Sequence, residues 1–146
     1  MVNWPHALRA LYWRVCRPTT LGSRCLVRRG ESVLLVRHTY DRWWYLPGGG
    51  VHRGESFLEA AQREVLEETG TAVHDLILFG LYHSRSEGKS DHIALFVGQL
   101  HGEPRICSGE IRDLCFAPIT RLPEDVSPAT RRRVAEYLTG VPDRRW

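Results

Sequence analysis

Three glutamates on one short predicted helix are the residues of this chain best suited to chemistry. Glu64, Glu67 and Glu68 lie within three and four residues of one another, so an α-helix would gather their carboxylates on nearly one face. Like charges at such spacings destabilise an exposed helix by about 0.2–0.5 kcal/mol each, and by more where water is excluded. Arg63 lies four residues before Glu67 and can neutralise one carboxylate, but it cannot serve all three. A further positive partner is therefore expected.

A divalent cation is the natural candidate for that partner. Oxygen ligands favour a hard ion, Mg²⁺ or Mn²⁺, over zinc. On the helix alone a solvated acidic face without metal would be the better interpretation, because Glu-rich helices are common. The preceding glycines change this balance: Gly48, Gly49 and Gly50 allow main-chain groups to approach closely, and Gly54 adds a bend. A tight loop of carbonyls and amides beside an acidic face suits a metal–phosphate site.

The boundaries of this helix are marked by its capping residues. Ser56 can cap the first turn, and Glu59 stands three residues later, which is the spacing of a capping box. Gly70 fits the left-handed position that closes a helix. These signals predict a helix over residues 56–69, whose apolar surface is expected to comprise Phe57, Leu58, Ala60, Ala61, Val65 and Leu66.

Strands are predicted on both sides of this helix. Two β-rich runs, 23–30 and 31–38, read as a hairpin that turns at Arg29–Gly30, and the apolar run Val33–Val36 indicates burial on both faces. A polar loop at 87–90 separates two later strands. The three strands expected after the helix lie at about 75–86, 92–100 and 114–117.

Two more helices are predicted near the ends of the chain. Residues 5–15 have the apolar spacing of a short amphipathic helix, which could pack on the domain or on a second subunit. Ser127 as N-cap, Pro128 at the first position and Gly140 past the end enclose the last helix. The tail, residues 141–146, is expected to be frayed, although Trp146 could pack. Helices and strands in this order indicate a mixed α/β sandwich.

The composition is that of a single domain of ordinary type. The chain has 146 residues, 42% hydrophobic and 25% charged, and a net charge of +3, which is well short of a dedicated nucleic-acid binder. No apolar run is long enough to span a membrane, so a cytoplasmic location is expected. Four cysteines without CxxC spacing argue against zinc and favour buried or partly buried free thiols.

The segment from residue 49 to residue 71, GGVHRGESFLEAAQREVLEETGT, resembles the Nudix box. The fixed positions agree: Gly49, then Glu55 after five residues, Arg63-Glu64 after seven more, Glu67-Glu68 and Gly70. Only Thr71 departs, because the family prefers a larger aliphatic residue there. The departure affects packing after the helix and leaves the acidic residues intact.

The resemblance implies a Nudix-type α/β/α sandwich with a mixed β-sheet as a single domain over residues 1–146. It also implies hydrolysis of a nucleoside diphosphate linked to another moiety, such as a nucleoside triphosphate or a nucleotide sugar. Magnesium or manganese ions would neutralise charge on the phosphoryl oxygens and make the attacking water easier to deprotonate. The implied metal ligands are the carboxylates of Glu64, Glu67 and Glu68 and the carbonyl of Gly48.

The same resemblance assigns roles to three other residues. Arg63 would orient a glutamate, and Glu55 would brace the loop or contact a second ion. Glu67 or Glu68 would act as the general base. Members of the family often add a glutamate from outside the box, and Glu110 is the candidate here, although it could equally be an ordinary surface residue.

Candidate substrate-binding residues lie outside the box, and core packing or solvation is the alternative for each. They are Arg37, Tyr40, Trp44, His83 and Arg85. Two other functions stay open. One is hydrolysis of RNA 5′ ends. The arginines 131, 132, 133, 144 and 145 would support it, unless they only solvate the last helix. The other is a nucleotide-sensing domain without catalysis, which is disfavoured because such domains usually lose box carboxylates. A homodimer is possible.

Overall fold

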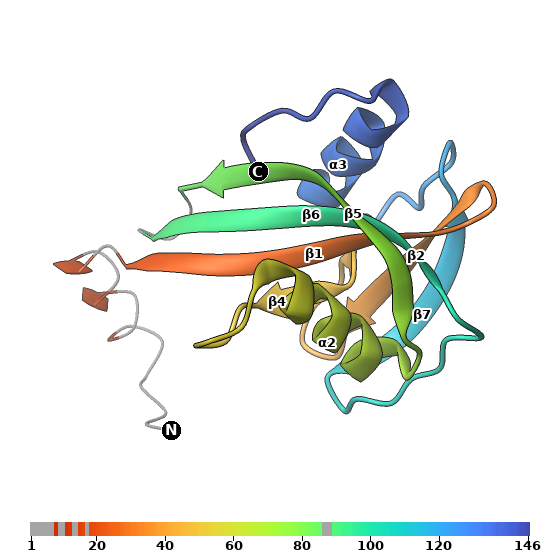
Figure 1. The fold of residues 1–146 in the computed structure, drawn as a ribbon, viewed down its shortest axis with the longest axis horizontal. Helices are drawn as coiled ribbons and strands as arrows, with labels where there is room; N and C mark the ends of the chain where they lie inside the picture. Colours follow the sequence, from red (N-terminus) through yellow and green to blue (C-terminus); the bar gives the residue numbers. More distant parts are fainter. Residues whose placement is uncertain (1–7, 9–10, 13–14, 17, 86–88) are drawn as a thin grey trace.

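The computed structural model describes residues 18–85 and 89–146, together with residues 8, 11, 12, 15 and 16. Its centre is a seven-stranded mixed sheet with the order β3-β2-β1-β6-β5, in which β4 pairs with β1 and β7 with β2 (Figure 1). β1 and β6 run parallel, and the other strand pairs are antiparallel. The strands are β1 Thr19–Arg29, β2 Ser32–His38, β3 Trp44–Tyr45, β4 Gly48–Gly50, β5 Val73–Ser84, β6 Ser90–Leu100 and β7 Ile111–Pro118.

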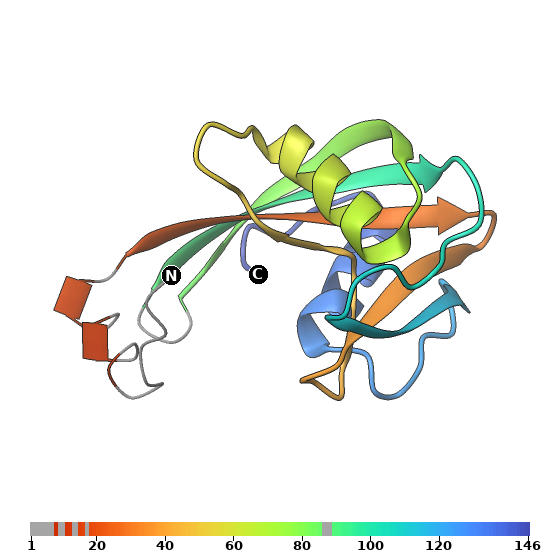
Figure 2. The same cartoon turned by 90° about the horizontal axis from the view of Figure 1, so that it is seen from below.

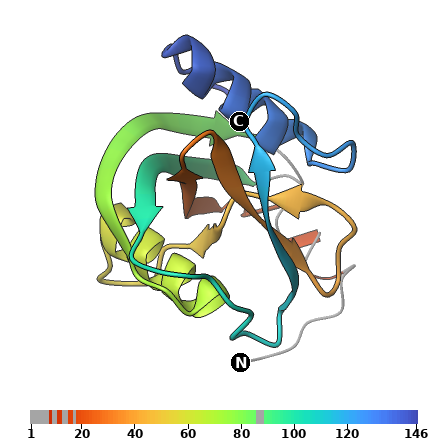
Figure 3. The same cartoon turned by 90° about the vertical axis from the view of Figure 1, so that its right-hand side faces the viewer.

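Two helices cover opposite faces of this sheet. Helix α2, Phe57–Thr69, lies on one side of β1 and β6, and helix α3, Pro128–Thr139, lies on the other (Figure 2). The sheet is strongly curved, with α2 inside the curve of β5 and β6 and α3 outside it (Figure 3). The expected α/β/α sandwich with a mixed sheet is confirmed.

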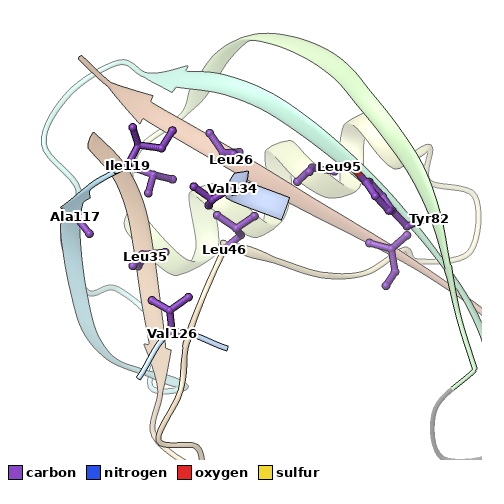
Figure 4. Packing of buried hydrophobic residues seen from close by; sticks show 11 residues of the cluster. Leu26, Leu35, Leu46, Tyr82, Leu95, Ala117, Ile119, Val126 and Val134 are labelled. Carbon is purple, nitrogen blue, oxygen red and sulfur yellow. The ribbon is translucent and has the colours of Figure 1, made fainter. Parts of the chain in front are cut away.

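Alternation along β1 creates two apolar cores, one on each face of the sheet. Cys25 and Val27 pack with Ala61 and Val65 of α2. Leu26, between them, belongs to the core on the α3 side, which also contains Leu35, Leu46, Tyr82, Leu95 and Val134 (Figure 4). Residues on the central strand thus fix the positions of both helices.

The ends of α2 are as predicted, and so is most of its apolar surface, except for two leucines. Ser56 accepts from the backbone N–H of Glu59, the Glu59 carboxylate accepts from Ser56, and Gly70 closes the helix with φ 64°. Leu58 and Leu66 are 41% and 50% exposed. Only one side of the helix touches the sheet, and Glu68 takes part of that buried stripe. The two leucines therefore face away from it.

The strand predictions are largely confirmed. The β1–β2 hairpin turns at Gly30, Val33 to Val36 are fully buried, and the three later strands appear as β5, β6 and β7. Residue 86 of the first predicted strand and residues 87 and 88 of the predicted polar loop lie outside the described residues, while Ser90, predicted in the loop, begins β6. The glycine segment, expected to be a loop, is instead strand β4, because Gly48, Gly49 and Gly50 pair with residues 22–24 of β1.

The predicted N-terminal helix falls mostly outside the described residues. Leu8, Leu11, Tyr12 and Val15 are described, are helical and are exposed. Within the described part of the chain, no helix combines the length and apolar character that a membrane crossing requires.

The four cysteines are free thiols, as expected, but their burial differs from the prediction. Cys25 is buried, which raises the pKa of its thiol to about 12, and Cys115 is partly buried. Cys16 and Cys107, however, are exposed. Cys107 lies in the irregular segment between β6 and β7, where the sheet no longer covers the side chains.

Candidate active site

Arg63 is the centre of the polar network on α2. Its guanidinium donates two hydrogen bonds to the Glu55 carboxylate, at 2.7 and 3.0 Å, and one to Glu64 Oε1 at 2.7 Å. It also donates to Glu67 Oε2 at 3.3 Å and to the carbonyl of Gly50 at 2.9 Å. Hydrogen bonding to Arg63 lowers the pKa of Glu55 to about 2 and raises the pKa of Arg63 itself. The Arg63 guanidinium thus connects the segment before the helix, residues 50–55 (the box loop), to the carboxylates of Glu64 and Glu67.

Glu68 is the one box carboxylate that is truly buried, with 6% of its surface exposed. The backbone N–H of Gly48 donates to its Oε2 at 3.0 Å. The pKa of Glu68 is raised to about 8, chiefly by burial and also by the carboxylates of Glu64 and Glu110, while Arg24 and the Gly48 N–H oppose this rise. An acid in such surroundings holds its proton at neutral pH unless more positive charge is supplied.

Strand β4 can approach β1 and α2 so closely only because it consists of glycine. Gly48 has φ 141°, and a Cβ there would lie 2.1 Å from the carbonyl oxygen of Ser23. A Cβ on Gly49 would lie 2.5 Å from Glu64 Oε1. The glycines therefore leave the room in which the Glu64 carboxylate lies against the strand.

Arg24, on β1, is a site residue that the sequence analysis missed. Its Nη1 donates to the carbonyl of Gly48 at 2.7 Å and to that of Leu46 at 3.2 Å. The carbonyl of Gly48, an expected metal ligand, therefore already accepts a hydrogen bond. No pattern in the sequence marks Arg24; its place in the site follows from the strand, where its neighbours Ser23 and Cys25 are fully buried.

Residues after β2 and before β7 complete the acidic end of the site. The carboxylate of Glu110 acts electrostatically on Glu68, Tyr40 and His38, which brings this glutamate from outside the box to the cluster. The carbonyl of Glu110 accepts from the N–H of Thr39 at 2.8 Å. Tyr40 stacks on His38 with ring centroids 5.0 Å apart but is 74% exposed, so the partial desolvation that, with Glu110, raises its pKa comes from one side of the ring only.

His38 belongs to the same region and was not among the expected site residues. It is 8% exposed, and its Nδ1 has no hydrogen-bond partner among the described residues. Burial, together with Arg24, lowers its pKa, so the neutral imidazole is favoured.

The other four candidate substrate residues are not gathered with these groups. Arg37 forms an ion pair with Asp125 and stacks over the Trp44 ring at 4.2 Å, and the Trp44 main chain is bonded to residues 125 and 127. The imidazole of His83 lies 2.9 Å from the Ser90 hydroxyl. Arg85 is exposed after the end of β5.

The donor chemistry of the cluster suits a hard divalent cation. Each carboxylate of Glu64, Glu67 and Glu68 has one oxygen held by Arg63 or Gly48, while its other oxygen accepts no hydrogen bond from the described residues. Across those residues no three Asp, Glu, His or Cys side chains converge into a formed metal site. Glu67, with 57% of its side chain exposed, is free to turn. The residues fit a metal, which would have to draw them together.

Comparison with known proteins decides the family. A family model described as the NUDIX domain matches residues 18–138, which include the whole sheet and nearly all of α3. The chain belongs to the Nudix family. It is a Nudix hydrolase, and enzymes of this family act on pyrophosphate bonds.

Individual Nudix relatives differ in how much of this chain they match. A Bacillus subtilis (strain 168) protein named "Putative 8-oxo-dGTP diphosphatase" is 33% identical over 119 residues, covering 81% of this chain and 78% of that protein. An NAD-capped RNA hydrolase NudC of Haemophilus influenzae (strain PittEE) is 42% identical over 62 residues, but these are only 37% of this chain and 22% of the relative. A MutT protein structure from Bacillus halodurans gives a TM-score of 0.70 with 27% identity, covering 86% of this chain and 84% of that one.

Proposed function

We propose that this chain is a divalent-metal-dependent pyrophosphohydrolase that cleaves a nucleoside diphosphate linked to another moiety, by attack of water on phosphorus. The observation that carries the proposal is the position of Glu68. This acid is buried against the N–H of Gly48, and burial together with the carboxylates of Glu64 and Glu110 raises its pKa to about 8. Such crowding of acids is unfavourable unless a cation joins them.

Mg²⁺ or Mn²⁺ is the proposed cation, held by Glu64, Glu67 and Glu68 with help from Glu110. When bound, it supplies the positive charge that the phosphoryl oxygens need in the transition state. The carbonyl of Gly48 stays a proposed ligand, because a carbonyl oxygen has two lone pairs and Arg24 uses one.

Side chains of the protein would position the metal ligands and accept the proton of the attacking water. Arg63 holds the carboxylates of Glu64 and Glu67 in place, and its bonds to Glu55 and Gly50 tie them to the box loop. Glu67 or Glu68 would accept the proton of the attacking water. Glu55 is committed to Arg63 by two hydrogen bonds, which favours the bracing role over contact with a second ion.

Nucleoside triphosphates are the first substrates to test, ahead of nucleotide sugars. The relative with the broad match is named for 8-oxo-dGTP diphosphatase activity. Hydrolysis of RNA 5′ ends has weaker support, because Arg133 is fully buried rather than exposed for phosphate contacts. A sensing domain is disfavoured because all the box carboxylates are present.

The test is a hydrolysis panel with Mg²⁺ or Mn²⁺, covering nucleoside triphosphates including 8-oxo-dGTP, nucleotide sugars, ADP-ribose, dinucleoside polyphosphates and 5′-triphosphorylated RNA. The inactive control is Glu67→Gln, and Glu124→Gln, an exposed glutamate on the loop before α3, is the matched neutral control. We expect metal-dependent cleavage that Glu67→Gln lowers at least about 100-fold and Glu124→Gln leaves unchanged. Full activity in Glu67→Gln would contradict the catalytic role, and nucleotide binding without turnover in the wild type would favour sensing.

Three broader expectations belong to the same proposal. They are a single Nudix domain, a cytoplasmic location and a possible homodimer. The exposed apolar side chains on edge strand β5, Ile77, Leu78 and Leu81, are the first surface to test for the homodimer.

A further inference from the structure

The tail, residues 141–146, is docked rather than frayed, which corrects the sequence prediction. It lies along β5: the N–H of His83 donates to the carbonyl of Arg144 at 2.9 Å, and the N–H of Trp146 donates to the carbonyl of His83 at 3.0 Å. The bridge between His83 and Arg145 is parallel. Main-chain pairing therefore fixes the direction of the tail and the position of Trp146.

A buried arginine of α3 holds the tail from the other side. Arg133 is fully buried, is paired with Glu136 and donates to the carbonyl of Arg145 at 2.7 Å. Its guanidinium lies 4.3 Å from the ring centre of Tyr82 and 5.2 Å from that of Trp146, and the two rings meet edge to face at 5.5 Å. A charge is buried at such a site only when its partners are well placed, so the indole is firmly held.

Trp146 lines a cavity that also reaches the box loop. The cavity has a volume of about 840 Å³, within the usual range for ligand sites. Gly49, Gly50 and Glu55 of the box line it, as do Arg24 of β1 and Trp146 of the tail. Arg24 also contacts the carbonyl of Gly48, so the cavity adjoins the carboxylate cluster.

The chemistry of the cavity wall differs from one part to another. Near the box, Arg24 and Arg53 bring positive charge, which suits phosphate. Outside the box, Trp146 and Ile93 bring apolar surface, Lys89 brings a further positive charge, and Asp91, whose Oδ1 accepts from the Thr20 hydroxyl at 2.8 Å, brings an acceptor. A carboxylate repels phosphate but can accept N–H donors of a base.

The geometry points to the docked tail as part of the substrate pocket, with Trp146 as the aromatic surface on which the nucleobase stacks. This inference rests on the proposed function, because it assigns the nucleoside end of the same substrate. Stacking of a base on an aromatic side chain tolerates any base, and its loss weakens binding by roughly 5- to 150-fold. Trp146 is thus a specificity residue for nucleotides over other diphosphates.

The experiment measures binding without turnover. On the Glu67→Gln background, isothermal titration with dGTP and with inorganic tripolyphosphate in Mg²⁺ compares Trp146→Phe, which keeps an aromatic face, with Trp146→Leu, which keeps apolar bulk only. We expect Trp146→Leu to weaken dGTP binding about 10-fold or more and Trp146→Phe by less than about threefold, with tripolyphosphate affinity unchanged in both. Arg132→Ala, an exposed position on α3, serves as the control.

Each other outcome overturns the inference. Equal dGTP affinity in parent and Trp146→Leu would remove the stacking role. Parallel loss of dGTP and tripolyphosphate affinity would show that the tail only supports the fold, and no dGTP binding by the parent would mean that the cavity takes no nucleotide. Hydrolysis by the wild type is scored separately in the panel, so failure of the proposed activity stays distinguishable from failure of this inference.

Discussion

At the scale of single residues, the site combines a strong counterion with an acid that lacks one. Arg63 satisfies Glu55, Glu64 and Glu67 from within the box. Glu68 has only the N–H of Gly48 and the nearby charge of Arg24. Ionisation of Glu68 therefore lowers the stability of the metal-free protein. Such losses of stability are common at functional sites.

This imbalance predicts that Glu68→Gln inactivates the enzyme and stabilises the metal-free protein. Because the pKa of Glu68 is raised from 4.5 to about 8 in the folded state, its protonated form favours folding, and stability is lost as pH rises through that range. Glutamine mimics the protonated acid. In chelator, the melting temperature of the variant should exceed that of the wild type by roughly 3 °C or more near pH 8.

The pH dependence supplies the control for this prediction. Below pH about 4.5 wild-type Glu68 is protonated in both states, so the two melting temperatures should converge there. A difference that is the same at all pH values, or a variant less stable at pH 8, would show that Glu68 is not an uncompensated acid.

At the scale of elements, strand β4 matters because it lies between β1 and α2. It pairs with residues 22–24 of β1, and the N–H of its Gly48 donates a hydrogen bond to the Glu68 carboxylate. The capping box at Ser56 fixes where α2 begins, and therefore where Glu64, Glu67 and Glu68 fall along the helix. Carboxylate positions thus depend on the absence of side chains in β4.

A pair of glycine substitutions tests this dependence. Gly49→Ala would place its Cβ 2.5 Å from Glu64 Oε1, whereas Gly50→Ala would meet only the Leu21 carbonyl, at 4.0 Å. Because the end of a glutamate side chain can shift, Gly49→Ala should keep the fold but lower kcat/KM by roughly 10- to 100-fold. Gly50→Ala should stay near wild type. Equal activity of the two variants, with unchanged melting temperatures, would refute the argument.

At the scale of the whole molecule, the site joins parts of the chain far apart in sequence. Arg24 comes from β1, Glu64, Glu67 and Glu68 from α2, Glu110 from the turn before β7 and Trp146 from the tail. The two apolar cores on either side of the sheet hold these parts together. A ligand that bridges them should therefore stabilise the folded protein as a unit.

Metal addition should raise the melting temperature of the wild type with no substrate present. A ligand at 100 times its Kd stabilises a protein by about 2.7 kcal/mol, which corresponds to roughly 8 °C for a chain of this size. Differential scanning fluorimetry over a Mn²⁺ series measures the shift. The double variant Glu64→Gln, Glu68→Gln should show little of it and Glu124→Gln all of it, and an equal shift in the double variant would place the metal elsewhere.

The local features of this protein follow from short-range patterns in its sequence. The spacing of the glutamates, the capping residues of α2 and α3, and the buried run in β2 depend on neighbours within a few residues, so the pattern alone predicts them. The box motif added the family, because its fixed positions are many and close together.

Only the tertiary structure decided what depends on contacts between distant segments. Arg24 and His38 join the site because strand pairing and burial bring them beside the glutamates, and no local pattern marks either one. Arg37 and Trp44, in contrast, lie away from the glutamates, because Arg37 pairs with the Asp125 carboxylate and the Trp44 N–H donates to the Asp125 carbonyl. The tail docks because a buried arginine on α3 and the edge of β5 both hold it. Burial and long-range hydrogen bonds are properties of the folded chain, and they assign these side chains their partners.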